Sequence, residues 1–326
     1  MRMDTMSASY RFEVAAVIAA CLLTAGCAGE DSSSVKVPYF PFGLAAFDNS
    51  VPERTPGSAF LYISDSGTDD VQMYHWPKPS NPVATLTGFD EPQGLCNDGK
   101  NAYVANTGDR DIVVYAAGAT SPSRTIPDPD GYPIECSFDP ASAGLAVVNI
   151  INNSYGQGSI DIYRNATGKP HDITSKELPK PFSVRYDASG DLFIVGINSS
   201  SVPVLAELRA NSKHIHIICP SLNLGPFPGA LGWDGTYIVL GGMKGSQQGL
   251  FRIKGCKPIG FIPIGHVVNF YIDGNRIVVP DPGNASVNVY SYPKGKLLST
   301  ISGFSEPLGV TIVPSQSPLG RFKREN

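Results

Sequence analysis

The sequence predicts an all-β protein, a six-bladed β-propeller with four antiparallel strands in each blade, on three observations. Turn-forming residues are abundant, with 34 Gly and 28 Pro among 326 residues. Charged residues make up 17% of the chain, whereas about 25% is usual for soluble domains. A pattern of short strands recurs six times with a period of roughly 40 to 47 residues, and four short strands at this period are typical of a propeller blade.

Each repeat begins with a short apolar strand that ends at a polar position, followed by a Gly turn and a strand that ends in Tyr. The clearest copies are residues 60–74 and 102–115. Further copies begin near Leu145, Leu192, Tyr237 and Arg276. Each repeat is therefore expected to supply the second and third strands of one blade.

Between these repeats lies another strand, which begins near a Pro and ends in Asp before a Gly turn. The copies end at Asp98, Asp139, Asp187, Asp234 and Asp273. Asp accepts local backbone hydrogen bonds and Gly adopts the positive φ of tight turns. We therefore expect each copy to be the inner strand of a blade, closed by a hairpin turn.

A sixth inner strand is expected at the C-terminal end of the repeats. Residues 304–309, Phe-Ser-Glu-Pro-Leu-Gly, closely match residues 89–94, Phe-Asp-Glu-Pro-Gln-Gly. We therefore expect residues 304–313 to supply the inner strand of the first blade and to close the ring, which leaves no open sheet edge. Residues 38–48 would then pack outside the ring or across one face. In the alternative, residues 40–48 supply the closing strand.

The first 26 residues have the pattern of a signal peptide. Arg2 and Arg11 precede an uncharged run from Val14 to Gly26, which is too short for a permanent membrane span. The run ends in Leu-Thr-Ala-Gly-Cys at Cys27, which resembles the bacterial lipobox and implies diacylglycerol on the Cys27 thiol. The alternative is an ordinary secretory signal with an incidental cysteine.

These features predict four segments. We expect a lipoprotein signal peptide over residues 1–26, a polar tether over 27–37, the propeller over 38–313 and a flexible basic tail over 314–326. The protein is therefore expected in the bacterial cell envelope, periplasmic or surface-facing, with a lipid anchor that attaches it to the membrane.

Residues 104–115 read Val-Ala-Asn-Thr-Gly-Asp-Arg-Asp-Ile-Val-Val-Tyr, which resembles the NHL repeat. The chain from about residue 58 to 313 is similar to six-bladed NHL-like propellers, among them bacterial lipoproteins of the same layout. The resemblance implies an architecture and says little about activity. Propeller lactonases and phosphotriesterases of this kind hold a divalent cation, and streptogramin lyases use a His base with magnesium. A calcium or magnesium ion is therefore the cofactor that the resemblance would imply.

In a propeller, the loops that enter the inner strands and those that leave the second strands share one face, at the mouth of the central channel. We expect a ligand to bind there through seven residues: Glu91, Asn106, Tyr132, Asn149, Phe227, His266 and Glu306. With Glu135, the carboxylate and amide oxygens of this set are hard ligands suited to calcium. In the alternative, Asp65, Asn106 and Asn149 recur because each makes a structural hydrogen bond to the next loop.

Two further features of the mouth have competing interpretations. Aromatic residues recur at one point of five repeats, at Phe89, Tyr132, Phe182, Phe227 and Phe304. They would either form a stacking surface for a ligand or pack between blades as core, and core packing is favoured. His266 is placed to act as a base, but a base needs a positioned partner and the sequence identifies none.

Four cysteines remain in the body of the chain. Cys219 and Cys256 lie beside outer strands of adjacent blades, so we expect a disulfide between them. Cys96 and Cys136 lie on successive inner strands. Simple alternation points them to opposite faces, so they are expected to be free and buried.

Charge and motifs exclude several classes of function. The net charge is −4 and no basic stripe carries interleaved aromatic residues, which argues against a nucleic-acid partner. The sequence has no G-x-S-x-G, no Gly-rich phosphate loop and no C-x-x-C pair. We expect a monomer that binds a small molecule or a protein through its mouth. The alternative is a metal-dependent enzyme, a lactonase-like hydrolase or a streptogramin-lyase-like protein.

Overall fold

A computed structural model describes residues 59–139, 141–222, 224–225 and 229–315. The chain divides into two units, Met1–Ser50 and Val51–Asn326, and all described residues belong to the second. The predicted signal peptide, Cys27, the tether, residues 38–48 and Phe227 lie outside the described residues. Within the described part, no helix has the length and apolar character needed to cross a membrane.

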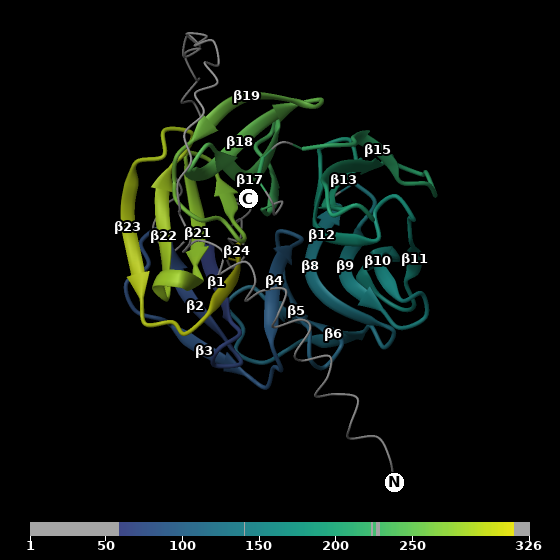
Figure 1. The fold of residues 1–326 in the computed structure, drawn as a ribbon. Helices are drawn as coiled ribbons and strands as arrows, with labels where there is room; N and C mark the ends of the chain where they lie inside the picture. The colour runs from purple at the N-terminus through teal and green to yellow at the C-terminus, as the bar shows by residue number, and fades with distance from the viewer. Residues whose placement is uncertain (1–58, 140, 223, 226–228, 316–326) are drawn as a thin grey trace, which may run out of the picture. The chain divides into compact units, whose positions relative to one another are not determined.

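Six antiparallel sheets of four strands are arranged in a ring (Figure 1), which confirms the predicted six-bladed propeller. Blade 1 contains β24 (Pro307–Pro314), β1 (Ala59–Asp65), β2 (Asp70–Trp76) and β3 (Ala84–Thr87). Blade 2 contains β4 (Pro92–Asn97), β5 (Asn101–Asn106), β6 (Asp111–Ala116) and β7 (Arg124–Pro127). Blade 3 contains β8 (Gly131–Asp139), β9 (Gly144–Asn152), β10 (Gln157–Tyr163) and β11 (His171–Ile173).

In the second half of the ring, blades 5 and 6 have inner strands of three residues each, whereas that of blade 4 has seven. Blade 4 contains β12 (Lys180–Tyr186), β13 (Leu192–Ile197), β14 (Pro203–Leu208) and β15 (His216–Cys219). Blade 5 contains β16 (Leu231–Trp233), β17 (Ile238–Lys244), β18 (Gln247–Lys254) and β19 (Lys257–Ile262). Blade 6 contains β20 (Tyr271–Asp273), β21 (Arg276–Asp281), β22 (Ser286–Ser291) and β23 (Leu297–Ser302).

The two ends of the described chain meet in blade 1, where β24 pairs with β1. Ala59 lies opposite Pro314, and Asp65 lies opposite Pro307. The C-terminal strand therefore closes the ring, as predicted from the repeat count. Because β24 is hydrogen-bonded along β1, the ring has no open edge at its seam.

The strand directions define two faces of the ring. At the mouth face the inner strands begin and the second strands end, as at Pro307 and Asp65. At the base face the inner strands end, and the third strands turn into the outer ones. Ala59 and Pro314 both lie at the base end of blade 1, so both ends of the described chain are on the base face.

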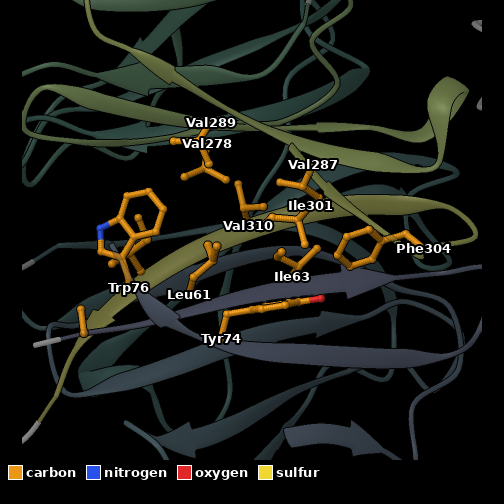
Figure 2. Close-up of a cluster of buried hydrophobic side chains, with 12 residues drawn as sticks. Leu61, Ile63, Tyr74, Trp76, Val278, Val287, Val289, Ile301, Phe304 and Val310 are labelled. Carbon is orange, nitrogen blue, oxygen red and sulfur yellow. The ribbon is translucent and has the colours of Figure 1, made fainter. Parts of the chain in front are cut away.

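The core lies between neighbouring blades. Figure 2 shows the cluster between blades 6 and 1, in which Leu61 and Ile63 face Val278 and Val287. Phe304 is 8% exposed and belongs to this cluster, while Phe89 packs between blades 1 and 2 with its ring centroid 6.1 Å from that of Tyr115. At these two positions the aromatic repeat residues are core, as favoured above.

Two disulfides link neighbouring blades. Cys219 and Cys256 are bonded across blades 4 and 5, as predicted. The prediction that Cys96 and Cys136 are free is wrong, because they form a disulfide between blades 2 and 3. Both inner strands have register shifts before these residues, and an extra residue in a strand reverses the face to which the following side chains point.

Candidate functional site

Asp65 fixes the mouth loop of blade 1. Its buried carboxylate accepts hydrogen bonds from the backbone N–H groups of Gly67 (3.1 Å), Ser305 (2.7 Å) and Glu306 (2.7 Å). The last two belong to the loop that enters β24. Asp65 therefore holds Glu306 at the start of the closing strand, in half-buried surroundings.

Asn106 has the same role in blade 2. Its Oδ1 accepts a hydrogen bond from the backbone N–H of Asp90 (2.8 Å), and its Nδ2 donates to Asp109 and Asp111 (3.0 Å each). The neighbouring Glu91 adopts a φ of +54°, and its N–H donates to Asp69 Oδ1 (2.9 Å). Asp65 and Asn106 thus make structural bonds to a neighbouring loop, which is the alternative stated for these repeat positions.

Asn149 occupies the corresponding place in blade 3 but has different neighbours. It is fully buried, and its Nδ2 donates to Asp128 Oδ2 (3.1 Å) and Ser159 Oγ (3.4 Å). The Ser159 hydroxyl donates in turn to Asp161 Oδ1 (2.7 Å). Sequence reasoning missed Asp128 and Asp161, because the acidic residue of the third strand lies at a different place in blades 1 and 2.

The buried carboxyls of blade 3 have strongly altered acidity. Burial and the neighbouring Asp128 raise the pKa of Asp161 to about 8. Burial likewise raises the pKa of Asp128, whose carboxyl is hydrogen-bonded to that of Asp161. Two carboxylates in contact in a buried site repel each other, so the state in which both are ionised is unfavourable.

Tyr132 stands at the mouth end of blade 3 and is half-buried. The guanidinium carbon of Arg110 lies 4.2 Å from the centroid of its ring, and the Arg110 guanidinium donates a hydrogen bond to its hydroxyl. Arg110 Nη1 also donates to the carbonyl of Pro129 (3.4 Å). The loops of blades 2 and 3 therefore present a stacked Arg–Tyr pair at the mouth.

His266 lies in the mouth loop that leads to blade 6 and is half-buried. Burial lowers the pKa of His266, and the carboxylate of Asp281 acts in the opposite direction. The imidazole is therefore mainly neutral near pH 7. The structure thus brings a carboxylate near His266, at the end of β21, which the sequence did not indicate.

A hydrogen bond between opposite blades crosses the central channel. Asn269, from the segment leading into blade 6, donates to Glu135 Oε2 on β8 of blade 3 (2.6 Å). Burial raises the pKa of Glu135 to about 7, against the pull of the Arg185 charge on β12. Gly94, on the neighbouring β4, leaves room for Glu135, since a Cβ there would lie 3.1 Å from Glu135 Cδ.

The mouth carries most of the exposed negative charge. Among the described residues, every exposed Asp or Glu lies in a mouth loop: Asp69, Asp109, Asp130 and Glu177. Exposed Lys side chains also occur at the mouth, on blades 3 to 5: Lys176, Lys180 and Lys244. The loops of blades 1 and 2 are therefore the acidic part of the mouth.

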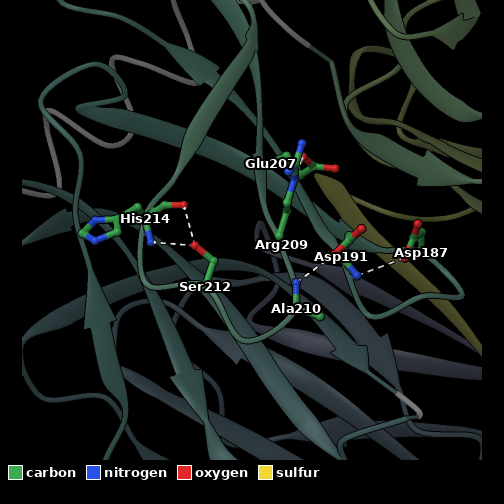
Figure 3. Close-up of polar contacts among 7 residues, drawn as sticks. All are labelled: Asp187, Asp191, Glu207, Arg209, Ala210, Ser212 and His214. Atoms are coloured by element: carbon green, nitrogen blue, oxygen red, sulfur yellow. Dashed lines mark hydrogen bonds and ion pairs between the residues drawn. The ribbon is translucent and has the colours of Figure 1, made fainter.

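The base face is basic. Eleven of the described Lys and Arg residues are exposed in its loops and adjoining strand ends: Lys78, Lys100, Arg124, Arg164, Lys169, Arg209, Lys213, Lys254, Lys257, Lys294 and Lys296. Its acidic residues are instead bound within turns. Figure 3 shows this in blade 4, where Asp187 accepts a hydrogen bond from the N–H of Asp191 (3.0 Å) and Asp191 from that of Ala210 (2.8 Å).

The predicted ligand-binding residues thus fall into two groups. Glu91, Tyr132, His266 and Glu306 lie at the mouth, where inner strands begin. Asn106 and Asn149 are turned inward and buried. Within the described residues, no three His, Cys, Asp or Glu side chains are placed to hold a metal ion together, so the channel shows no such set for calcium or magnesium.

Comparison with protein-family models and with curated protein sequences gives no match. Solved structures resemble the fold. A chain of a nidogen/laminin complex has 16% identity and a TM-score of 0.66, over 79% of this chain and 100% of that one. TolB from Acinetobacter baumannii has 16% identity and a TM-score of 0.58, over 79% and 67%. A protein of unknown function from Bacteroides caccae has 10% identity and a TM-score of 0.59, over 79% and 99%.

Proposed function

We propose that this protein is a lipid-anchored binding module of the bacterial cell envelope, with the base face toward the membrane and the mouth face toward its partner. The observation that carries the proposal is the separation of the two faces. Both ends of the described chain and eleven exposed basic residues lie at the base, whereas the loops held by Asp65 and Asn106 lie at the mouth.

The charge of the base supports its orientation toward lipid. Anionic lipid headgroups attract Lys and Arg side chains by about 1 kcal/mol for each residue near the surface. The chain that follows a lipidated Cys27 would enter the propeller at Ala59, the first residue of β1. This strand begins at the same face. A lipid chain and a basic surface acting together hold a protein more firmly than either alone.

The chemistry of the mouth favours a partner with positively charged groups. Asp69, Asp109 and Asp130 are exposed on the loops of blades 1 and 2. The Glu135–Asn269 bridge crosses the channel below them, so binding is assigned to the mouth loops. Since those loops are held by buried hydrogen bonds, they lose little conformational entropy when a partner binds.

The anchor is tested by Cys27→Ala in the full-length chain. The variant is expected to move from the membrane fraction to the soluble fraction, with wild type as the control. Unchanged membrane association would contradict lipidation at Cys27.

The mouth is tested with a labelled nona-lysine peptide as the cationic probe. The triple variant Asp69→Asn, Asp109→Asn, Asp130→Asn keeps the side-chain shapes and removes three charges, so the dissociation constant is expected to rise at least about tenfold at low salt. The control is Glu177→Gln with Glu207→Gln on blades 3 and 4, which should change the dissociation constant less than twofold in total. Equal losses per charge in both variants would show that the mouth of blades 1 and 2 is not the binding surface.

A further inference from the structure

The exposed apolar side chains of the propeller are concentrated on one side of its base. Among the described residues, the exposed large hydrophobic side chains are Val83, Tyr155, Ile259, Leu297 and Leu298. Tyr155 lies in a mouth loop of blade 3. The other four lie at or near the start of an outer strand, β3 of blade 1, β19 of blade 5 or β23 of blade 6. Outer strands begin at the base face, and Figure 1 shows these three strands following one another along the rim of the ring.

Exposed lysines accompany these aliphatic side chains in every one of the three blades. Lys257 is close before Ile259 on β19, and Lys296 directly precedes Leu297, which is 51% exposed. Lys78 lies in the turn that leads to Val83 in blade 1. No exposed Asp or Glu of the described residues lies on the base face. This side of the base is therefore both apolar and positively charged.

The opposite side of the base is basic without being apolar. Blades 2 to 4 carry the other six exposed basic residues of the base: Lys100, Arg124, Arg164, Lys169, Arg209 and Lys213. Their outer strands β7, β11 and β15 begin with an exposed polar residue: Arg124, His171 and His216. The start of an outer strand thus does not require an aliphatic side chain, and the apolar character of blades 5, 6 and 1 needs its own explanation.

We propose that Val83, Ile259, Leu297 and Leu298, here called the apolar rim, insert into the headgroup layer of an anionic lipid bilayer. The base would then meet the membrane at a tilt, with blades 5, 6 and 1 deepest. This inference rests on the proposed orientation of the base toward lipid. Aliphatic side chains gain by leaving water at the boundary between headgroups and acyl chains, and neighbouring basic groups bind anionic headgroups.

Two further features agree with insertion at this side. The stem of a Lys side chain can lie along apolar groups while its ammonium group reaches the headgroups, which suits the lysines beside the rim. Ala59, where the chain that follows Cys27 enters the propeller, lies at the base end of blade 1. The chain to the proposed lipid therefore begins at the side of the base that carries the apolar rim.

The first test measures insertion at single positions in the lipidated full-length protein, reconstituted in vesicles containing 30% phosphatidylglycerol. Leu298→Trp places a fluorescent probe at the second residue of β23, and Thr125→Trp places one at the second residue of β7, where the side chain is also exposed. Wild type supplies the background of the two native tryptophans. Lipids brominated on their acyl chains should quench the emission added by Leu298→Trp by about half, and that added by Thr125→Trp by less than about a tenth, because only the rim reaches the acyl boundary.

The second test separates insertion from charge, with the Cys27→Ala chain and the same vesicles in a sedimentation assay. Replacing all four residues of the apolar rim by Thr preserves the charge and suits a strand. The variant should bind at least about tenfold more weakly, because its side chains no longer remove apolar surface from water. Tyr155→Thr, at the mouth, is the matched control and should change binding less than twofold. Circular dichroism should show both variants folded as wild type.

The outcomes distinguish this inference from the proposed function on which it rests. If Lys78→Glu with Lys257→Glu weakens vesicle binding and the Thr variant does not, the base faces lipid through charge alone and the insertion is overturned. Equal quenching of the two Trp probes, or quenching of neither in protein that stays with the vesicles, would overturn it while leaving the anchor intact. If the Cys27→Ala chain does not bind the vesicles at all, the orientation and the insertion both fail.

Discussion

The mouth and base faces differ in how far their Asp side chains are exposed to solvent. At the base, Asp98 accepts hydrogen bonds from the backbone N–H groups of Lys100 (2.8 Å) and Asn101 (2.6 Å), and Asp234 accepts from those of Thr236 and Tyr237. At the mouth, Asp69 and Asp109 each accept one hydrogen bond, from the Glu91 N–H and from Asn106 Nδ2, and remain exposed. A hydrogen-bonded carboxylate keeps its charge, so the two faces differ in which carboxylates reach solvent, because an Asp at the start of a tight turn is bound by the turn itself.

The largest expected effect comes from removing β24, the strand that closes the ring and runs from the mouth face to the base face. Truncation after Gly303 deletes β24 and exposes the edge of β1, so the protein is expected to lose its cooperative unfolding transition or to aggregate. Truncation after Ser315 should leave the melting temperature nearly unchanged, as measured by circular dichroism. A well-folded monomer that ends at Gly303 would show that β24 is not required for closure.

The second largest effect is expected from reversing the charge of basic residues on the base face and measuring binding to anionic vesicles. With the Cys27→Ala chain and vesicles containing 30% phosphatidylglycerol, Lys78→Glu, Lys100→Glu and Lys257→Glu together should weaken binding about 100-fold or more, since each basic residue contributes about 1 kcal/mol. The matched mouth variant replaces the three exposed Lys of blades 3 to 5 by Glu. Sedimentation should show little change for it, and equal losses in the two variants would remove the distinction between the faces.

A smaller effect compares one turn from each face. Asp65→Ala should lower the free energy of unfolding by about 3 kcal/mol, because three backbone N–H groups lose a charged acceptor in a buried place. Asp98→Ala should cost about 1 to 2 kcal/mol, because water replaces the acceptor at this half-exposed turn. Urea unfolding measures both values. The reverse order would show that burial does not determine how much each turn depends on its Asp.

The smallest effect concerns Glu135, in the channel between the faces. Its carboxyl has a pKa of about 7 in the folded protein, so the folded state keeps a proton that the unfolded state loses. Stability is therefore expected to fall by about 2 kcal/mol as the pH rises from 5 to 7. Glu135→Gln keeps an acceptor for Asn269 and should remove this contribution from the pH profile of unfolding, leaving the fall that comes from Asp161, whose pKa is about 8. An equal slope in Glu135→Gln would assign the pH dependence to other groups.

Much of the fold follows from the sequence because its signals are local and repeated. The closing strand was predicted from the likeness of residues 304–309 to residues 89–94, and β24 confirms it. The Cys219–Cys256 disulfide followed from neighbouring outer strands. The structural bonds of Asp65 and Asn106 were one of two interpretations of their repeat positions, beside ligand binding.

The remaining features depend on geometry that a linear pattern does not contain. The Cys96–Cys136 bond results from bulges that reverse side-chain alternation. The bond from Asn269 to Glu135 crosses the ring between residues 134 positions apart. Asp161 interrupts no strand pattern, so only the folded blade shows that it meets Asp128.

The pairing of β24 with β1 also determines the order in which the ring is completed. The Glu306 N–H that Asp65 accepts is 241 residues later in the chain, and at 5 to 20 residues per second its synthesis follows by roughly 10 to 50 s. During that interval β1 has no inner neighbour, and no ring can close around it. The proposed anchoring requires the chain to cross a membrane before it folds. Because the ring cannot close until the last strand has been made, the chain remains unfolded enough to cross during that interval.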